Sequence, residues 1–215
     1  MNNEFDTLVF DYNGTLVDDV DLCLNLLNKM LKANNHKEVT KKDYLNIFTF
    51  PIKEYYRQAG FDFDSGKDDF AKLAYEFDKD YRAMFINCPL FDDVISCLSK
   101  FKQTKRLLVL SATKEQQLDE QLRFFKIRDY FDDIIGIKDI YANSKLQEAI
   151  DYFSTHEFNP KRTLFIGDTI HDLEVASTLN ARCALVARGH QSKKRLEQAN
   201  PFVVTESIEE LIPLI

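Results

Sequence analysis

The chain has 215 residues, of which 45% are hydrophobic and 29% are charged, a composition typical of a folded globular protein rather than a disordered one. The 35 acidic and 28 basic side chains leave a formal net charge of -7, which argues against nucleic acid or an anionic membrane as a partner. No apolar run approaches the roughly 18 residues of a membrane span, and the N-terminus lacks the basic and apolar regions of a signal peptide.

The cysteines and histidines give no sign of a zinc or redox site. No two cysteines have the C-x-x-C spacing, and no histidines have the H-E-x-x-H spacing. Each cysteine stands among apolar residues, which favours buried free thiols over disulfides. We therefore expect a cytoplasmic protein. The cysteines are Cys23, Cys88, Cys97 and Cys183.

A short strand followed by several helices is predicted for the first part of the chain. The apolar run at 8–10 is β-branched and aromatic, which is typical of a buried strand. From 18 to 34 the apolar residues recur at helical spacing on one face. The segment 18–86 holds no convincing strand, and its further helices are expected at 40–48, 51–60 and 70–85.

After Pro89 the predicted helices and strands alternate. Such alternation indicates βαβ units and a parallel sheet with helices on both faces. The sequence therefore predicts an α/β domain that is interrupted, after its first strand, by an all-helical insert. Strands are expected at 106–110, 134–137, 163–166, 184–186 and 202–204, and helices at 91–101, 114–125 and 146–153, after 166 as far as 179, and from 207 onward.

Polar residues follow three of these strands. Asp11 comes after the first strand, Ser111 after the strand at 106–110, and Asp168 after Gly167. Ligands of open α/β sheets bind beyond the carboxyl ends of the strands. We therefore expect these three remote residues to converge on one site.

The segment Asp11–Leu16 has two interpretations. Its Asn13-Gly14 pair between apolar runs is typical of a β-hairpin turn. The helical pattern that begins soon after Leu16 leaves little length for a second strand, which weakens the hairpin. The alternative is a turn that places Asp11 beside free backbone N–H groups, an arrangement suited to phosphate.

Asp168 and Asp172 are four residues apart, so both can lie on one side of a strand-to-helix turn. They are also what an ordinary helix N-terminus favours, because acidic residues there complement the helix dipole. If Asp11 is nearby, three carboxylates share one pocket and need a cation. Mg²⁺ is the usual ion where phosphate is also bound. We expect His171, between them, to be exposed.

Lys145 follows Ser144 at an expected helix start, with Ser144 as the cap. A lysine in the first turn of a helix opposes the helix dipole, so another reason for its position is possible. A solvated surface lysine and a functional lysine stay equally open on position alone.

Together these residues resemble the haloacid-dehalogenase-like (HAD) hydrolase superfamily, above all its phosphatase-rich branch similar to phosphoglycolate phosphatase and β-phosphoglucomutase. Asp11–Leu16 matches the first motif, Ser111 the second, Lys145 the third and Gly167–Asp172 the fourth. The resemblance covers nearly the whole chain. It implies a Rossmann-like core of residues 1–17 and 87–215, with residues 18–86 as a helical cap domain inserted after the first strand.

The resemblance implies a Mg²⁺-dependent phosphatase acting on a small phosphorylated metabolite, as a monomer or homodimer. Asp11 would be the nucleophile that forms an aspartyl-phosphate. Mg²⁺ would be held by Asp11, Asp168 and the backbone carbonyl of Asn13, with Asp172 binding directly or through water. The substrate phosphoryl group would be held by Gly14, Thr15, Ser111 and Lys145, of which Lys145 is also counted as catalytic. Cap contacts to substrate are expected from Phe48, Thr49, Phe50, Pro51, Lys53, Tyr56 and Arg57.

Asn13 departs from the pattern of the family. Phosphatases of the family usually have a second aspartate at this catalytic position, as general acid and base, and an amide cannot transfer that proton. Such help typically contributes about 10²–10⁴-fold. The sequence predicts a slow phosphatase, a leaving group that needs no protonation (an acyl phosphate, for example), or another group that substitutes. The alternative is a catalytically impaired protein that binds a phosphorylated ligand or a partner protein.

Overall fold

The structure is a computed structural model that describes residues 4–138, 141 and 144–215. The described residues form one sheet of six strands in the order β3-β2-β1-β4-β5-β6, and every neighbouring pair is parallel. The α/β fold predicted from the sequence is therefore confirmed. The strands are β1 (Thr7–Phe10), β2 (Arg106–Lys114), β3 (Asp133–Ile137), β4 (Thr163–Gly167), β5 (Arg182–Val186) and β6 (Val203–Thr205).

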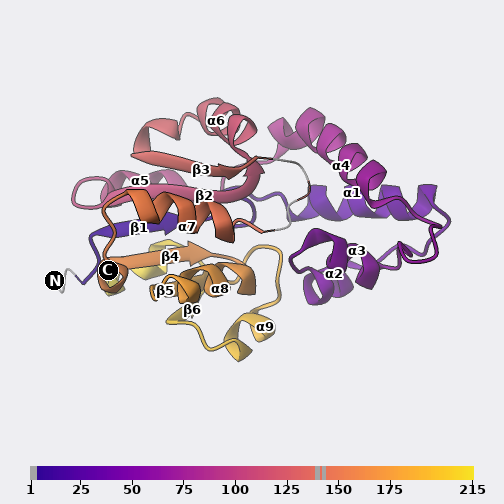
Figure 1. Cartoon of the computed structure of the whole chain (residues 1–215). Coiled ribbons are helices and arrows are strands. Elements are labelled where there is room, and N and C mark those ends of the chain that lie inside the picture. The colour runs from indigo at the N-terminus through magenta and orange to yellow at the C-terminus, as the bar shows by residue number, and fades with distance from the viewer. Residues whose placement is uncertain (1–3, 139–140, 142–143) are drawn as a thin grey trace.

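Helices cover both faces of the sheet (Figure 1). Leu8 and Phe10 of β1 pack on one face with α5 and α6, whereas Val9 packs on the other with α7 and α8. Each central strand is thus buried on both sides, which explains why its sequence is apolar without a gap. The core helices are α5 (Val94–Phe101), α6 (Glu115–Phe124), α7 (Leu146–Thr155), α8 (Ile170–Thr178) and α9 (Lys193–Gln198).

The helical insert lies between β1 and β2 and stands beyond the carboxyl ends of the strands (Figure 1). It has a hydrophobic cluster of its own, which includes Leu27, Leu31, Tyr44, Tyr56 and Leu73. The insert predicted from the sequence is confirmed, and its division from the core at residues 18 and 86 stays a prediction. Its helices are α1 (Val20–Ala33), α2 (Lys41–Ile47), α3 (Ile52–Ala59) and α4 (Phe70–Met84).

The insert helices begin and end where local chemistry favours it. Thr40 and Asp43 form a capping box at the start of α2, with each side chain near the backbone N–H of the other. Asp69 accepts hydrogen bonds from two backbone N–H groups at the start of α4. Gly60 ends α3 at a φ of 121°, a conformation that favours glycine.

Three details differ from the sequence predictions. β2 continues past Leu110 as far as Lys114, so Ser111 lies within the strand, where the pairing register with β3 shifts. The last helix is a short 3₁₀ helix that contains Pro213, which cannot donate a helical hydrogen bond. α9 was not expected, since Leu196 is its only buried residue and gives no periodicity. The 3₁₀ helices are η1 (Phe85–Asn87), η2 (Arg128–Tyr130), η3 (Pro160–Arg162) and η4 (Glu209–Leu214).

The four cysteines are free and buried, as expected from their apolar surroundings. In the part of the chain that the structure describes, no helix combines the length and the apolar character needed to cross a membrane.

Candidate active site

The strand order brings the polar strand ends together. β1 lies between β2 and β4, so Asp11, Ser111 and Asp168 come from three adjacent strands. The Asp11 N–H donates to the carbonyl of Ile166 at 2.8 Å and extends the ladder between β1 and β4 by one residue. Carboxylate oxygens of Asp11, Asp168 and Asp172 lie within 4.8 Å of one another. The structure therefore gathers acids from both ends of the sequence into one cluster.

The segment after Asp11 is a tight turn that leads into α1, so the β-hairpin interpretation is wrong. The Leu16 N–H donates to the Tyr12 carbonyl at 2.8 Å. Gly14 has a φ of 69°, and a Cβ there would lie 2.5 Å from Asp168 Oδ2. Only glycine satisfies both constraints.

Gly14 and Thr15 each donate a hydrogen bond to a buried carboxylate. The Gly14 N–H is directed at Asp19 Oδ1 at 2.9 Å, so it is not free for phosphate here. The Thr15 hydroxyl donates to Asp168 Oδ1 at 3.2 Å, and Thr15 is fully buried. Both residues therefore fix a neighbouring carboxylate, and neither lines the pocket described below.

Lys145 lies at the start of α7 and points into the acidic cluster. Its Nζ is 2.5 Å from Asp11 Oδ1 and 2.6 Å from Asp172 Oδ1, and it donates to the Leu110 carbonyl at 3.1 Å. Its side chain is only 4% exposed, so the surface interpretation is wrong. Burial by itself would lower the pKa of Lys145, but the charges of Asp11 and Asp172 raise it above the usual value.

The pKa values of the three carboxyl groups differ, because Lys145 does not stabilise their charged forms equally. Burial raises the pKa of Asp11 well above its usual value, although Lys145 opposes this. Burial and the charge of Asp172 raise the pKa of Asp168 to about 6. Burial also opposes ionisation of Asp172, but Lys145 outweighs it and lowers that pKa. The cluster lacks positive charge, and its hard oxygen donors fit a divalent cation such as Mg²⁺.

Asp172 also caps the start of α8. Its Oδ2 accepts hydrogen bonds from the Thr169 N–H at 3.0 Å and the Thr169 hydroxyl at 2.7 Å. The helix-capping and acidic-cluster interpretations of Asp172 therefore both hold. His171 beside it is 7% exposed, and its ring stacks on Phe50 at 4.7 Å between centroids, so the expectation of an exposed histidine is wrong. The first turn of α8 faces the insert and not solvent.

The side chain of Asn13 is held by three partners. Its Oδ1 accepts from the Thr113 hydroxyl at 2.9 Å. Its Nδ2 donates to Asp19 Oδ2 at 2.8 Å and to Tyr81 Oη at 2.7 Å. Ser111 helps to fix this arrangement, because its hydroxyl accepts from the Thr113 N–H at 3.0 Å. The surroundings of position 13 therefore match an amide, which both donates and accepts.

Asp19 and His190 form a buried ion pair beside Asn13, which sequence reasoning missed. His190 Nε2 is 3.3 Å from Asp19 Oδ1, and its Nδ1 is 2.7 Å from Tyr44 Oη. Burial opposes the charge on His190, but Asp19 raises its pKa to about 9, so the imidazolium donates to both partners. The backbone N–H of His190 also donates to Asp168 Oδ2 at 2.6 Å. No motif or spacing marks this pair, because its members are far apart in the sequence.

A pocket of about 160 Å³ lies between the acidic cluster and the insert. Asp11, Asn13, Ser111, Lys145 and Asp168 line its base. Of the expected cap contacts, Phe48, Phe50 and Tyr56 line the pocket, whereas Thr49, Pro51, Lys53 and Arg57 do not.

A parallel sheet, an acidic cluster at its carboxyl edge and a helical cap over that edge define a hydrolase with a Rossmann-like core and a cap domain. The sequence pattern of the haloacid dehalogenase-like hydrolases matches residues 8–186, and the chain belongs to this family.

Relatives over the full length support the assignment. Pyrophosphatase PpaX of Bacillus cereus is 20% identical, over 99% of this chain and 97% of its own. A haloacid dehalogenase-like hydrolase from Streptococcus pneumoniae has a TM-score of 0.84 at 18% identity, covering 100% of this chain and 99% of that one. CbbY from Rhodobacter sphaeroides, solved in complex with phosphate, has a TM-score of 0.74 at 18% identity, covering 96% of each chain. At these identities the structural likeness shows the fold.

The charge imbalance predicts that Asp168→Asn stabilises the protein in EDTA at pH 7.5. The pKa of Asp168 is about 6 in the folded protein and 3.8 when unperturbed, so its ionisation penalises the folded state above pH 6 and not below pH 3.8. This difference corresponds to about 3 kcal/mol, and the free energy of unfolding should rise by up to about that amount. Urea denaturation followed by circular dichroism measures it.

The gain should fade as the pH approaches 4. Asp21→Asn, which changes an exposed acid on α1, is the control and should have little effect. A variant that is less stable than the wild type at pH 7.5 in EDTA would contradict the charge imbalance.

Proposed function

We propose that the protein is a Mg²⁺-dependent phosphatase that hydrolyses a phosphomonoester of a small metabolite through an aspartyl-phosphate at Asp11. One observation carries the proposal: Asp11 and Lys145 are in contact at the base of a capped pocket, beside two further carboxylates. A carboxylate nucleophile next to a fixed cation suits transfer of an anionic phosphoryl group.

The chain's own residues account for both chemical steps. An oxygen of Asp11 attacks phosphorus, and the bond from phosphorus to the leaving oxygen breaks. Lys145 and the Ser111 hydroxyl hold the transferring phosphoryl group. Water then hydrolyses the aspartyl-phosphate, which releases phosphate and restores Asp11. Because Asn13 has no proton to transfer, the rate depends strongly on how well the leaving group bears negative charge.

The donor set supports Mg²⁺ as the cofactor. Asp11, Asp168 and Asp172 offer oxygens within 4.8 Å of one another, and the backbone carbonyl of Asn13 is the further expected ligand. When bound, the ion supplies positive charge to the acids and the phosphoryl oxygens. The acidic composition and the free cysteines support a cytoplasmic protein with no nucleic acid or membrane partner.

The amide network around Asn13 favours a second candidate, a catalytically impaired member that binds a phosphorylated ligand or a partner protein. Asn13 is fixed by Thr113, Asp19 and Tyr81, so its amide is built into the site. Such a protein would keep the phosphate-binding groups and lack efficient turnover.

We predict that Asp11→Asn lowers turnover of a panel of phosphate esters by at least about 10³-fold, because it removes the nucleophile. EDTA should abolish wild-type turnover, and added Mg²⁺ should restore it. Asp21→Asn, which changes an exposed acid, is the control and should keep wild-type rates. Turnover that persists without metal, or in Asp11→Asn, would refute the mechanism.

Mg²⁺ binding should strengthen as the pH rises through 6. Burial raises the pKa of Asp168 to about 6, and the carboxylate must lose its proton to bind the ion. Titration calorimetry should give an affinity about tenfold weaker at pH 5 than at pH 7.5. An affinity that does not change between these pH values would exclude Asp168 as a ligand.

Asn13→Asp distinguishes the two candidates. The new carboxyl group would face Asp19 Oδ2, which is 2.8 Å from the amide nitrogen, and the like charge raises its pKa and keeps it protonated. We expect turnover of alkyl phosphates to rise by about 10²–10⁴-fold, the usual contribution of a general acid.

Asn13→Ala is the matched control, because it removes the amide and adds no acid. It should show no gain. If Asn13→Asp also shows no gain, while the wild type binds phosphate esters and turns none of them over, the impaired candidate is the correct one.

A further inference from the structure

The wall of the pocket that faces the phosphoryl site is aromatic. Phe48, Phe50, Tyr56, Phe77 and Tyr81 line it, from α3, α4 and the segment after α2. Phe50 and Phe77 are only half-buried, so a ligand in the pocket would cover further apolar surface. Covering such surface is favourable, at about 25 cal/mol per Å².

Several polar atoms on this wall already have partners. Tyr81 Oη donates to Asp19 and accepts from Asn13, and Tyr44 Oη bonds to His190. Asp78, the acid of α4 that lines the pocket, accepts from Gln117 Nε2 at 3.0 Å. A hydroxyl-rich leaving group would exchange its hydrogen bonds with water for contacts with rings, which is unfavourable.

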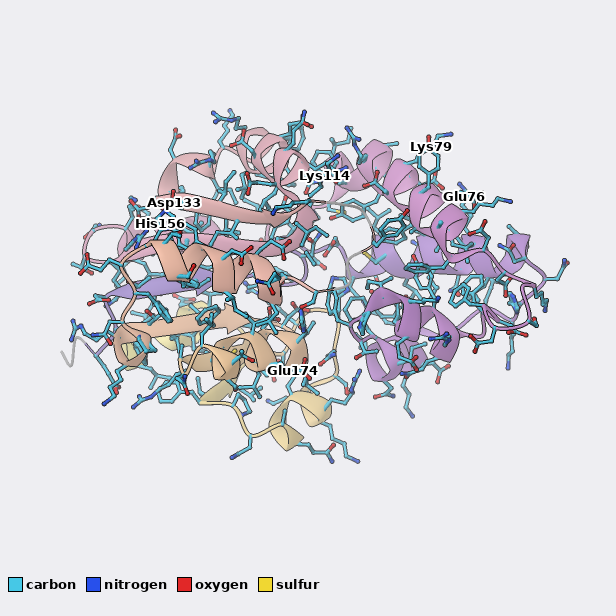
Figure 2. All side chains as sticks on the ribbon, in the orientation of Figure 1. Glu76, Lys79, Lys114, Asp133, His156 and Glu174 are labelled. Atoms are coloured by element: carbon cyan, nitrogen blue, oxygen red, sulfur yellow. The ribbon has the colours of Figure 1, made fainter. Side chains whose placement is uncertain are left out.

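The cap supplies no cation to this wall, as far as the described residues go. Lys53 lies 5.7 Å from the centroid of the Phe63 ring, and Arg57 pairs with Asp64 at 2.9 Å, both outside the pocket. Lys145 and His190 are in the pocket, but each is balanced by buried acids. Lys114, the remaining lining lysine, is exposed where the core meets the cap (Figure 2).

A second anionic group set against the aromatic wall, away from the exposed Lys114 at the boundary of core and cap, would be buried without a partner. It would lie against aromatic rings and near the carboxylates of Asp19 and Asp78, at the cost of both desolvation and repulsion. The pocket volume of about 160 Å³ is comparable to the cavities of about 150 Å³ that hold a molecule the size of benzene.

The chemistry at position 13 points to the same class of leaving group. A phenol has a pKa near 10, as tyrosine does, so its oxide departs without being protonated. An alkoxide is far more basic and needs the acid that Asn13 cannot provide. The aromatic wall and the amide at position 13 both suit an aryl leaving group.

Resting on the proposed function, we infer that the substrate class is the phosphate monoester of a small, uncharged aryl alcohol. Asp11 takes the phosphoryl group, and the aryl oxide leaves and gains a proton from solvent. Water then cleaves the aspartyl-phosphate to inorganic phosphate. Monoesters with a second negative charge, and pyrophosphate, are poor substrates.

The direct test compares phenyl phosphate with 4-carboxyphenyl phosphate, which share the ring and differ in one charge. With Mg²⁺, kcat/KM should be at least tenfold higher for phenyl phosphate, although the carboxylate makes the other phenol the better leaving group. Pyrophosphate and phosphoglycolate should be slower than phenyl phosphate as well.

Phe77→Lys places a cation in the wall at a half-buried position and should reverse the preference toward 4-carboxyphenyl phosphate. Phe63→Lys changes a half-buried cap phenylalanine outside the pocket and should keep the wild-type ratio. Equal or faster hydrolysis of the doubly charged esters by the wild type would overturn the substrate class and leave the phosphatase intact. No turnover of any ester would overturn the proposed function, and this inference with it.

Discussion

A buried surplus of negative charge at the carboxyl ends of β1 and β4 is the constraint on which the site depends. Asp11, Asp168 and Asp172 meet there around a single lysine, Lys145. Such a cluster costs stability, and it persists because the strands that carry it are buried in apolar side chains on both faces of the sheet. In the proposed mechanism, the same imbalance gives the site its affinity for a cation and, with that cation, for an anionic phosphoryl group.

A second buried cluster joins the cap to this site. His190 of the core contacts Tyr44 of α2, and Asp19 contacts Tyr81 of α4. Asn13 lies between the two clusters and donates to both Asp19 and Tyr81. Since Tyr81 of the cap bonds directly to Asn13, a movement of the cap changes the hydrogen bonding of Asn13. The pocket and the turn after Asp11 are therefore joined by direct hydrogen bonds.

The sequence was sufficient for the fold and for the acidic cluster, for a physical reason. Asp11 and Asp168 follow apolar strands, and the ends of parallel strands meet at one edge of a sheet, so their proximity follows from the α/β pattern. The sequence left open whether Lys145 is buried. Its position opposes the helix dipole, but nothing in the sequence identifies the acids that it contacts. No motif or spacing in the sequence marks Asp19 or His190, whose pairing depends on how the cap packs on the core.

The expectation that His171 is exposed was wrong for the same reason, because the burial of its ring depends on how the cap packs on the core. The first turn of a helix usually faces water, whereas here Phe50 stacks on the ring and Ser144 contacts it. The aromatic wall of the pocket could not be predicted from the sequence either. The helical pattern of the insert marks its apolar residues as core, and does not separate those that fill the cap from those that face a ligand.

The most direct measurement is a crystal structure of the protein with Mg²⁺ and a fluoride mimic of the phosphoryl group. The account predicts the mimic on a carboxylate oxygen of Asp11, in contact with Lys145 and Ser111, and one ion between Asp11 and Asp168. An ion bound elsewhere, or a mimic that leaves Asp11 untouched, would contradict it.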